Sequence, residues 1–565
     1  GVSPAARGSP VSADVPSSTS VETATAAERR IFRRDNLPAL LAALFSGLVL
    51  KFVSPPVGMD FLHWATFVPL FVVVAYVPRR QAFKLGYLSG FAGVFVLFFW
   101  LAQTIDLFSN IPLILASLIV ALFAAVWGLP YGVLSMAIGP FRRRFGKFWP
   151  FPFACLWVGV EFAHPAVFPY FQGVGQYRNP YTWQLASVFG AMGISWLLIL
   201  TNATLAAIVL TRREKSPFPT VTLAITAALF LANLGFGAWR FGQVETALAS
   251  APVAKVAMLQ QGVTMVQRIQ DRGGEVLVSW MELTTKAVTT DGHLQVNADA
   301  AKDEPQLEIV GTPIADLPDL VVWPEGSIYY NPTDKRVLPI FEAMTRQYGF
   351  SFLVGGGTRE ADPDNPGKRA SWNSAYLFGP DGKIKGRYDK MVPMPFGEYL
   401  PWPFSYLKPY IEGVGSFRPG TKPTVFETGE FSFTTPICYE AILERQMRTL
   451  ADGDAYVNIT NDGWFGDTAA PHQHAMLSAV AAVEMGRPML RIAYTGVSMI
   501  VEPHGVIRYE TQPYKESVQV VDLRLAQFET PYRSWGRYFP WVASLFAVAA
   551  LIAVRRPVTL PPTSS

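Results

Sequence analysis

The sequence predicts a multi-span α-helical membrane domain joined to a globular α/β domain. Three observations lead to this fold class. Half of the 565 residues are hydrophobic and only 16% are charged, which is too apolar for an ordinary soluble enzyme of this length. Seven long apolar stretches precede residue 241, and an eighth lies near 539–554. The intervening segment, 241–537, has the mixed composition of a domain in which strands and helices alternate.

The apolar stretches have the length of membrane-crossing helices, which need ~20 residues to span the hydrocarbon core. The fifth is the least regular, because Pro150 and Pro152 interrupt it. Soluble domains rarely contain seven such stretches in succession, so we interpret them as transmembrane helices and not as buried core helices. The seven lie at 37–55, 61–78, 85–103, 111–139, 149–163, 182–210 and 218–239.

Basic residues between the stretches predict the orientation, since Lys and Arg accumulate in short cytoplasmic loops. They precede the first stretch and follow the second, fourth, sixth and eighth. The loops 56–60 and 104–110 contain none, and 164–181 contains only Arg178. Both ends of the chain are therefore expected in the cytoplasm and 241–537 outside it. The basic residues are Arg29, Arg30, Arg33, Arg34, Arg79, Arg80, Lys84, Arg142, Arg143, Arg144, Lys147, Arg212, Arg213, Lys215, Arg555 and Arg556.

Five segments follow from these patterns. The first 35 residues are rich in Ala, Ser, Thr, Val and Pro and contain no apolar run that could act as a cleavable signal peptide. We expect a disordered cytoplasmic tail over 1–35, a membrane domain of seven transmembrane helices over 36–240, an external globular domain over 241–537, an eighth transmembrane helix over 538–556 and a cytoplasmic tail over 557–565.

Charge and cysteine content exclude two classes of protein. The formal net charge of +4 is small for this length, so there is no indication of nucleic acid binding. Only two cysteines occur, Cys155 in an apolar run and Cys438 in a mixed, polar region, which excludes a disulfide framework and argues against a bridge between them. If Cys438 faces an oxidising compartment, it does so as a lone thiol.

The external segment alternates short β-branched and aromatic runs with amphipathic stretches. Catalytic residues in such domains usually lie where strands end and loops begin. Predicted strands cover 254–260, 319–323, 351–355, 373–378, 431–437, 455–460, 490–502 and 516–522. Predicted helices cover 274–288, 334–348, 440–451 and 472–485.

Three strand ends place reactive side chains. Glu325 directly follows an apolar strand, Lys390 and Glu398 lie in an aromatic, proline-rich loop, and Cys438 lies between a strand and a helix. A thiol of ordinary pKa, ~8.5, needs a base or a positive environment to act as a nucleophile near neutral pH. Glu325 could take the proton, and Lys390 could stabilise a tetrahedral oxyanion with the help of backbone N–H groups after Cys438. Glu398 could orient Lys390 or relay a proton.

Each of these residues also has a structural interpretation. A cysteine after a strand is more often part of an inert core, a glutamate after Trp-Pro can cap a helix, and a lysine can be a solvated surface charge. Their joint occurrence at three strand ends, in the order Glu325, Lys390, Cys438, favours the catalytic interpretation.

Several motifs resemble those of the nitrilase (carbon-nitrogen hydrolase) superfamily, and the whole chain is similar to the apolipoprotein N-acyltransferase family within it. The resemblance implies an αββα sandwich for the external domain, with a Glu-Lys-Cys triad. The motifs, in order, are Trp323-Pro324-Glu325, Lys390 followed by Pro395-Phe396-Gly397-Glu398-Tyr399, Ile437-Cys438-Tyr439-Glu440, Asn461-Asp462-Gly463-Trp464-Phe465-Gly466, Pro471-His472-Gln473-His474, Gly486-Arg487-Pro488 and Thr495-Gly496-Val497-Ser498.

Carried over to this chain, the resemblance implies Glu325 as general base, Lys390 as oxyanion stabiliser and Cys438 as acylated nucleophile. Three further residues match functional positions of the family, namely Glu398, Tyr439 and Glu440. The implied reaction is a ping-pong exchange, the last step of lipoprotein maturation. Cys438 takes an acyl chain from a phospholipid, typically the sn-1 chain of phosphatidylethanolamine, and passes it to the N-terminal amine of a diacylglyceryl-modified lipoprotein cysteine.

The same resemblance implies a bacterial inner-membrane protein with a periplasmic catalytic domain, no cofactor, no metal and a monomeric state. Both substrates keep their acyl chains in the bilayer, so we expect apolar loop residues at the approach to the site. The alternative is that these residues pack within the domain. The candidates for lipid contact are Met391, Met394, Phe396, Tyr399, Trp402, Phe404, Tyr406, Trp464 and Phe465.

Two features depart from the family pattern. Gln270 occupies the place where the family usually has a functional Trp, and Trp280 is the nearest candidate, although it comes later than expected. The polar, acidic stretch 289–318 is longer than usual, and we expect a mobile insertion there.

Two other functions stay open at this stage. A membrane-tethered amidohydrolase of the nitrilase type would use the same three residues with water as acceptor, but would not need seven spans. A transporter with an external binding domain would normally have ionisable residues along its pathway, whereas the spans contain little beyond Lys51, Asp106 and Glu161, all near span ends.

Overall fold

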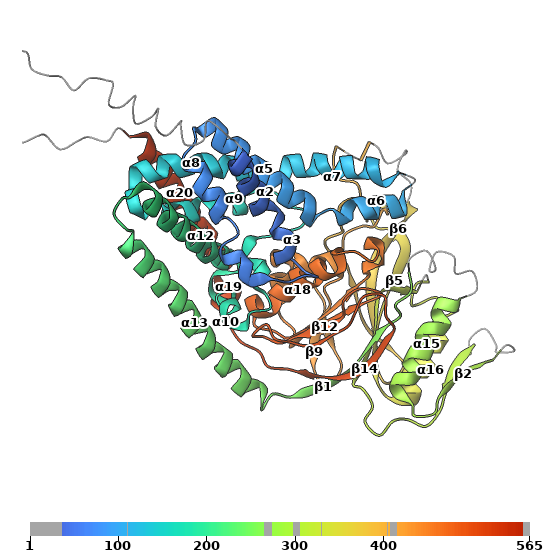
Figure 1. Ribbon diagram of the computed structural model, residues 1–565. Helices are drawn as coiled ribbons and strands as arrows, with labels where there is room; N and C mark the ends of the chain where they lie inside the picture. Colours follow the sequence, from blue (N-terminus) through green and yellow to red (C-terminus); the bar gives the residue numbers. More distant parts are fainter. Residues whose placement is uncertain are drawn as a thin grey trace, which may run out of the picture.

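A helical region and an α/β domain lie side by side in the computed structural model, and the long helix α13 (Thr220–Leu248) leads from the first to the second (Figure 1). The last helix, α20 (Tyr538–Arg555), returns to the helical region and packs against α9 (Pro150–Ala163). The tails predicted over 1–35 and 557–565 lie outside the described residues. The structure describes residues 37–109, 111–264, 274–297, 306–328, 330–403, 405–406 and 415–556.

The helical region forms from the apolar stretches of the sequence. Their Leu, Ala, Val and Phe side chains are apolar, so the backbone N–H and C=O groups are the main polar groups. A helix pairs these groups in hydrogen bonds within one segment. The other helices of this region are α2 (Leu37–Leu48), α3 (Leu50–Val53), η1 (Asp60–Trp64), α4 (Val68–Val74), α5 (Arg79–Leu97), α6 (Trp100–Phe108), α7 (Leu113–Trp127), α8 (Leu129–Phe145), η2 (Gly146–Phe148), η3 (Gln172–Gln176), α10 (Pro180–Trp183), α11 (Ala186–Phe189) and α12 (Ala191–Glu214).

Four helices of the described residues are long and apolar enough to cross a membrane, and a fifth span results if α5 and α6, which meet at 46°, count as one. The four are Leu113–Phe148, Ala191–Glu214, Thr220–Leu248 and Tyr538–Arg555. Shorter apolar helices at Leu37–Val53, Asp60–Val74 and Pro150–Ala163 coincide with the remaining predicted stretches. The multi-span helical fold is thus confirmed, while the count of eight spans stays a prediction.

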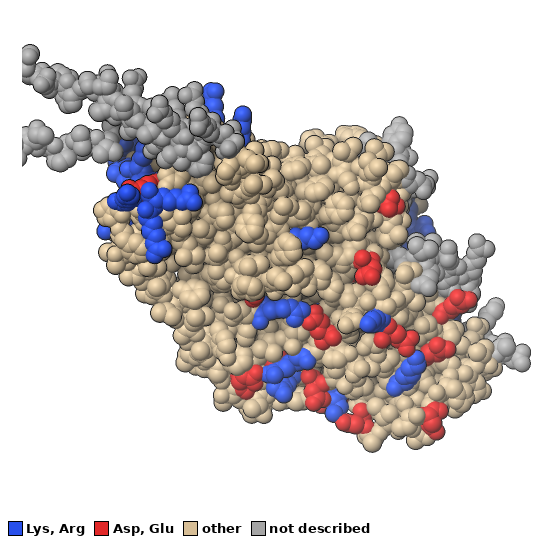
Figure 2. Space-filling view, viewed as in Figure 1, with Lys and Arg blue, Asp and Glu red and all other residues tan. Residues whose placement is uncertain are grey.

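Basic residues gather at one end of the helical region. Figure 2 shows Lys and Arg side chains concentrated around the ends of α8 and α20, whereas acidic and basic side chains are interspersed over the α/β domain. The orientation predicted from these basic residues stays a prediction. The basic residues in the last turns of α8, α12 and α20 are Arg142, Arg143, Arg144, Arg212, Arg213 and Arg555.

Helices α5 and α8 approach each other closely because glycines lie at their contact. A Cβ atom added to Gly90 would lie 2.6 Å from the carbonyl oxygen of Gly128, and one added to Gly86 would lie 2.5 Å from that of Tyr131. Small residues are typical of helix contacts in lipid, where apolar burial gives no driving force between helices and close packing supplies the attraction.

Two six-stranded sheets form the α/β domain. Parallel pairing of β1 with β4, of β4 with β5, and of β10 with β9 and β11 makes their centres, while antiparallel strands complete the edges. In the order of pairing, the first sheet contains β14 (Ser517–Arg524), β1 (Val253–Gln260), β4 (Leu320–Ile328), β5 (Ser351–Asp362), β6 (Asn365–Phe378) and β7 (Ile384–Asp389). The second contains β13 (Ile507–Glu510), β12 (Met499–Val501), β11 (Met489–Ala493), β10 (Ala455–Thr460), β9 (Ser432–Thr434) and β8 (Val425–Glu427).

The sheets pack face to face and helices cover their outer faces. Along β1, Val256 and Met258 belong to the core shared with the second sheet, whereas Ala257 and Leu259 pack under helices, as the period of two in a strand requires. The first sheet is covered by α15 (Glu275–Val288) and α16 (Leu338–Tyr348), and the second by η5 (Cys438–Ile442), α17 (Glu444–Thr449) and α18 (Ala470–Met485). The short helix η6 (Asp462–Phe465) packs Phe465 against the helical region. The αββα sandwich is confirmed.

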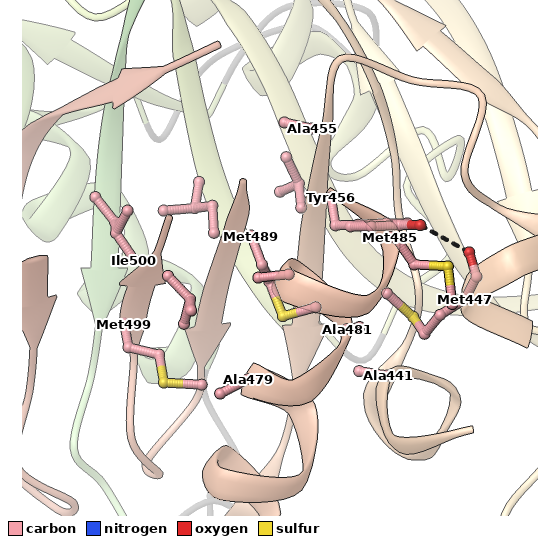
Figure 3. Close-up of a cluster of buried hydrophobic side chains, with 14 of the residues drawn as sticks. Ala441, Met447, Ala455, Tyr456, Ala479, Ala481, Met485, Met489, Met499 and Ile500 are labelled. Atoms are coloured by element: carbon pink, nitrogen blue, oxygen red, sulfur yellow. Dashed lines mark hydrogen bonds between the residues drawn. The ribbon is translucent and has the colours of Figure 1, made fainter. Parts of the chain in front are cut away.

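The core between the second sheet and α18 combines methionines with small residues. The side chain of Met499 lies beside Ala479 of α18, and the hydroxyl of Tyr456 donates to the carbonyl oxygen of Met447 at 2.8 Å (Figure 3). Because alanine leaves space, α18 can lie close to the sheet, while the flexible methionine side chains fill the remaining gaps. This packing fixes α18, which lines the candidate site described below.

Some predicted elements differ from the structure. The single strand predicted over 490–502 is wrong, since β11 and β12 are separate antiparallel strands. The helix predicted over 440–451 is divided, because Leu443 is extended between η5 and α17. Within 289–318, the antiparallel strands β2 (His293–Val296) and β3 (Leu307–Val310) form a small sheet, and 298–305 lies outside the described residues.

The contact at Gly90 predicts a stability effect. Gly90→Ala should lower the thermal unfolding temperature of the detergent-solubilised protein, because overpacking of a close contact costs about 1–3 kcal/mol. Gly235→Ala on α13 is the control, since a Cβ atom there meets nothing within 4 Å. Equal unfolding temperatures for the two variants would contradict the close packing of α5 on α8.

Candidate active site

Cys438 begins the short helix η5, immediately after a bridge that joins Ile437 to Ile459 at the end of β10. Its φ angle of 52° lies in the left-handed region, which a residue with a side chain rarely adopts. The side chain is buried, with 6% of the residue exposed. The backbone of Cys438 is therefore strained, and the turn holds its thiol beyond the end of β10 in the second sheet.

Glu325 lies near the end of β4, in the centre of the first sheet. One carboxylate oxygen, Oε1, accepts from the side-chain amide of Asn373 at 2.6 Å, and the other, Oε2, accepts from the backbone N–H of Asn461 at 2.8 Å. Asn461 follows β10 of the second sheet, so this hydrogen bond crosses from one sheet to the other.

Lys390 directly follows β7 and is almost completely buried, with 2% exposed. Its Nζ lies 2.7 Å from Oε2 of Glu398 and 3.4 Å from Oε1 of Glu325. The carboxylate of Glu398 also accepts from the backbone N–H of Met394 at 2.7 Å, which folds the loop after Lys390 back on itself. The structure thus brings together the predicted glutamates and lysine.

Asn373 on β6 is a site residue that the sequence did not indicate. Its amide donates both to Glu325 and, at 2.7 Å, to Oε1 of Glu398. Its backbone oxygen accepts from the N–H of Lys390 at 2.9 Å. Asn373 therefore sets the spacing of all three charged groups. Asn373 belongs to no motif. The one signal in the sequence was its position just before the apolar half of β6, Ser374–Phe378.

Glu440 and Tyr439 position the cysteine turn. The buried carboxylate of Glu440 accepts from the backbone N–H of Ile437 at 2.8 Å and from that of Met391 at 2.7 Å. The hydroxyl of Tyr439 donates at 2.6 Å to the carbonyl oxygen of Val167, in the segment between α9 and η3 of the helical region. The turn is thereby tied to the lysine loop on one side and to the helical region on the other.

Burial and charge set the resting protonation of the site. Burial, reinforced by the charge of Glu325, raises the pKa of the Cys438 thiol, which Lys390 opposes. Burial alone would lower the pKa of Lys390, but the carboxylates of Glu398 and Glu325 raise it overall. Lys390 correspondingly lowers the pKa of Glu398 against the effect of burial. Near neutral pH the site therefore contains a protonated thiol, an ammonium group and a carboxylate at Glu398.

A small apolar cavity opens beside Cys438, between the helical region and the α/β domain, and its empty space of about 400 Å³ includes the open solvent at its mouth. The indole N–H of Trp100, at the start of α6, donates at 3.0 Å to Gln473 of α18, so the bend between α5 and α6 is joined to the cavity wall. The cavity is lined by Phe98, Trp100, Phe168, Tyr170, Met394, Cys438, Tyr439, Phe465, Ala470, Gln473, His474 and Leu477.

The predicted lipid-contact residues divide into two groups. Met394 and Phe465 line the cavity, and Met391 packs partly buried against the core. Exposed residues of the group are Phe396 (48%), Tyr399 (38%), Trp402 (79%), Tyr406 (74%) and Trp464 (46%). Each of these exposed side chains is free to contact lipid or another molecule, as aromatic residues at a membrane surface do. Phe404 lies outside the described residues.

Gln270 also lies outside the described residues, whereas Trp280 is fully buried on α15. The Trp280 ring stacks on that of Trp323 at a centroid distance of 5.7 Å, in the core under the first sheet and away from Cys438. Trp280 thus has a packing role, so it does not replace the tryptophan expected near residue 270.

Among the described residues, one group of side chains has the composition of a metal site, formed by Glu245, Glu502 and His504. It lies where α13 meets the turn between β12 and β13, apart from the cysteine. Arg508 forms ion pairs with both of its carboxylates. The protein's own guanidinium therefore supplies the positive charge at this junction.

Two family models match this chain, one in the helical region and one in the α/β domain. A family model described as carbon-nitrogen hydrolase matches residues 309–530, and one described as the apolipoprotein N-acyltransferase N-terminal domain matches residues 46–204. An apolipoprotein N-acyltransferase from Geobacter metallireducens is 29% identical over 544 residues, covering 93% of this chain and 96% of the relative. One from Sinorhizobium fredii is 30% identical over 500 residues, covering 82% of this chain and 85% of the relative.

The chain belongs to the apolipoprotein N-acyltransferase family. It is accordingly a nitrilase-superfamily acyltransferase and a multi-span membrane protein. Among solved structures, an amidase from Nesterenkonia sp. AN1 is similar to the chain at 17% identity, with a TM-score of 0.33, covering 50% of this chain and 93% of the amidase.

The charges around Cys438 in this apolipoprotein N-acyltransferase family member predict how its thiol titrates. In a Cys155→Ser background, alkylation of Cys438 by iodoacetamide should still increase with pH above the ordinary thiol pKa of ~8.5, because the pKa is raised. Lys390→Met should move the midpoint of this increase further upward. Lys385→Met is the control, since Lys385 is an exposed lysine paired with Asp381. A midpoint below ~8.5 would contradict the raised pKa.

Proposed function

We propose that the protein transfers an acyl chain from a phospholipid, from the sn-1 position of phosphatidylethanolamine, to the N-terminal amine of the diacylglyceryl-modified cysteine of a lipoprotein, as the last step of lipoprotein maturation. The observation that supports this best is the apolar cavity, which joins Cys438 to membrane-domain side chains such as Trp100 and Phe168. A small hydrophilic amide would not need such a lining, whereas an acyl chain would be stabilised by it at roughly 0.8 kcal/mol per buried CH₂ group.

In the first half-reaction, Glu325 takes the proton of Sγ as the sulfur attacks the ester carbonyl of the phospholipid. Lys390 donates to the oxyanion that forms, assisted by backbone N–H groups at the start of η5. The carbon–oxygen bond of the ester then breaks, and the glycerol oxygen takes the proton from Glu325. The raised pKa of Cys438 makes this base necessary, since little thiolate exists at rest.

Three supporting residues hold this arrangement. Glu398 binds the ammonium of Lys390 and keeps it aimed between the two carboxylates. Glu440 and Tyr439 hold the turn of Cys438 against the lysine loop and the helical region. In the second half-reaction, the acceptor amine attacks the thioester, and the amide leaves with the acyl chain.

We further propose that both ends of the chain are cytoplasmic and that the α/β domain is periplasmic, in a monomer of the bacterial inner membrane. The basic ends of α8, α12 and α20 support this orientation. The exposed aromatic residues Trp402, Tyr406 and Trp464 would then meet the outer surface of the bilayer, where both lipid substrates present their reactive groups.

Intact-mass analysis tests the thioester. Incubation with phosphatidylethanolamine should add the mass of one acyl chain, removable by hydroxylamine, and Cys438→Ala should abolish this adduct because no other described thiol lines the cavity. Cys155→Ser serves as the control and should keep the adduct. A thioester that water hydrolyses as fast as a diacylglyceryl-cysteine peptide removes it would identify an amidohydrolase instead.

The cavity predicts a dependence on chain length. Ala470→Phe should slow thioester formation from long-chain phospholipids by about 10-fold or more, since an overpacked contact costs about 1–3 kcal/mol. Ala470 is buried in the cavity wall at the start of α18. A short-chain ester should still react at the original rate, which also verifies that the variant folds. Equal slowing of both donors would place the acyl chain elsewhere.

A further inference from the structure

His474 on α18 is a buried histidine of the cavity wall that the reaction described above does not use. It shares the cavity with Cys438, and 8% of the residue is exposed. The ring of Phe465 meets the imidazole edge-on at a centroid distance of 6.2 Å. The imidazole is thus held between aromatic and aliphatic neighbours in the wall of the cavity that Cys438 also lines.

The orientation of the imidazole is fixed by a buried ionic network. Nδ1 of His474 lies 2.7 Å from Oδ1 of Asp462, and Oδ2 of the same carboxylate lies 2.7 Å from Nη2 of Arg491. Burial opposes the charge of Asp462, but Arg491 and His474 lower its pKa overall. Nη2 of Arg491 also lies 3.2 Å from Nδ1, but the shorter contact is to the ionised carboxylate, which accepts only, and this contact favours the ring proton on Nδ1.

The other ring nitrogen, Nε2, has no hydrogen-bond partner within the part of the chain that the structure describes. Burial, together with the charge of Arg491, lowers the pKa of His474, against the opposing charges of Asp462 and Glu325. The ring is therefore neutral, and Nε2 has a lone pair at the edge turned away from Asp462. A buried acceptor without a donor costs about 1–3 kcal/mol, and a bound ligand that donates there would remove this cost.

Transfer of the acyl chain to an amine needs a group on the protein that can accept a proton, as Nε2 could. The nitrogen that attacks a thioester must lose a proton, and α-amino groups have pKa values of about 7.7–8.0, so the proton does not leave readily without a base. Glu325 serves the thiol in the first half-reaction, and Asn373, Lys390 and the N–H of Asn461 all donate to its two oxygens, whereas no donor of the described residues reaches Nε2 of His474. His474 belongs to the wall of the cavity that Cys438 also lines.

We infer that His474 binds the α-amino group of the acceptor and acts as its base in the second half-reaction. The amine nitrogen forms a bond to the thioester carbon, the carbon–sulfur bond breaks, and Nε2 takes the surplus proton from nitrogen. The imidazolium, stabilised by Asp462, then returns the proton to Sγ of Cys438, so no proton is gained or lost. The ligand is thus a primary amine whose neighbouring acyl chains remain in lipid.

This inference rests on the proposed function, and its test separates the two half-reactions. Wild type, His474→Gln and His472→Gln are first charged with phosphatidylethanolamine, and the rate of thioester formation is followed by intact mass. The charged proteins are then mixed with a synthetic S-diacylglyceryl-cysteine peptide, and loss of the thioester is timed. His472 is the matched control, being a histidine two residues away on the same helix that does not line the cavity.

His474→Gln should form the thioester at the wild-type rate and discharge it to the peptide about 100-fold more slowly, the usual contribution of a general base. His472→Gln should match wild type in both steps. Discharge of His474→Gln at the wild-type rate would overturn the inference, and so would equal slowing of both steps, which indicates a purely structural role. If wild type forms no thioester, the proposed function itself fails, a result distinct from failure at His474.

Discussion

The arrangement of the site depends on one buried carboxylate, that of Glu440. It accepts hydrogen bonds from the backbone N–H groups of Met391 and Val392, which follow Lys390, and of Ile437, which precedes Cys438. The hydroxyl of Tyr388 also donates to it, at 2.9 Å. Burial raises the pKa of Glu440 to about 7 in spite of these donors, so the group tolerates its environment only while they surround it. The lysine loop and the cysteine turn, distant in sequence, must therefore keep their conformations together.

The contact between the two regions of the chain is as specific as the site itself. Polar bonds cross it at several places, including Trp100 to Gln473, Tyr439 to Val167, and the backbone N–H of Ala191 to Glu484 at 2.9 Å. Each bond joins a segment near the end of an apolar helix to an element that borders the cavity. A rigid contact of this kind keeps the thiol at a defined depth relative to the bilayer surface, which loosely tethered domains would not do.

Sequence patterns predicted the parts of the fold that obey a simple period. Strands β1 and β10 and helix α18 follow their predicted bounds closely, because continuous burial leaves a continuous apolar signal, whereas the stretch predicted over 182–210 is divided into α10, α11 and α12. The pattern failed at 490–502, because β11 and β12 are both fully buried and the turn between them, which contains Thr495 and Gly496, is short. Strand β7 was missed because its residues, Ile384–Asp389, are mostly polar and gain stability from pairing with β6.

The same limit applies to the site. Glu325, Lys390 and Cys438 could be predicted from the sequence, because Glu325 and Cys438 follow apolar strands and all three lie in recognisable motifs. The proximity of Asn373 to both glutamates could not, since it depends on the antiparallel pairing of β6 with β5 and β7. For His474, the sequence shows the motif but not which ring nitrogen has a partner. The structure shows that Asp462 contacts Nδ1 and that Nε2 has no partner among the described residues.

The left-handed backbone at Cys438 has a consequence for how the sequence can change over time. A side chain at a φ of 52° costs about 1–3 kcal/mol, a cost that glycine would not incur. Drift toward the most stable chain therefore favours an inert residue where the thiol stands. Under the function proposed above, the cysteine persists through selection for its chemistry, and a copy of the gene released from that selection would be expected to lose the proposed nucleophile while the rest of the fold endures.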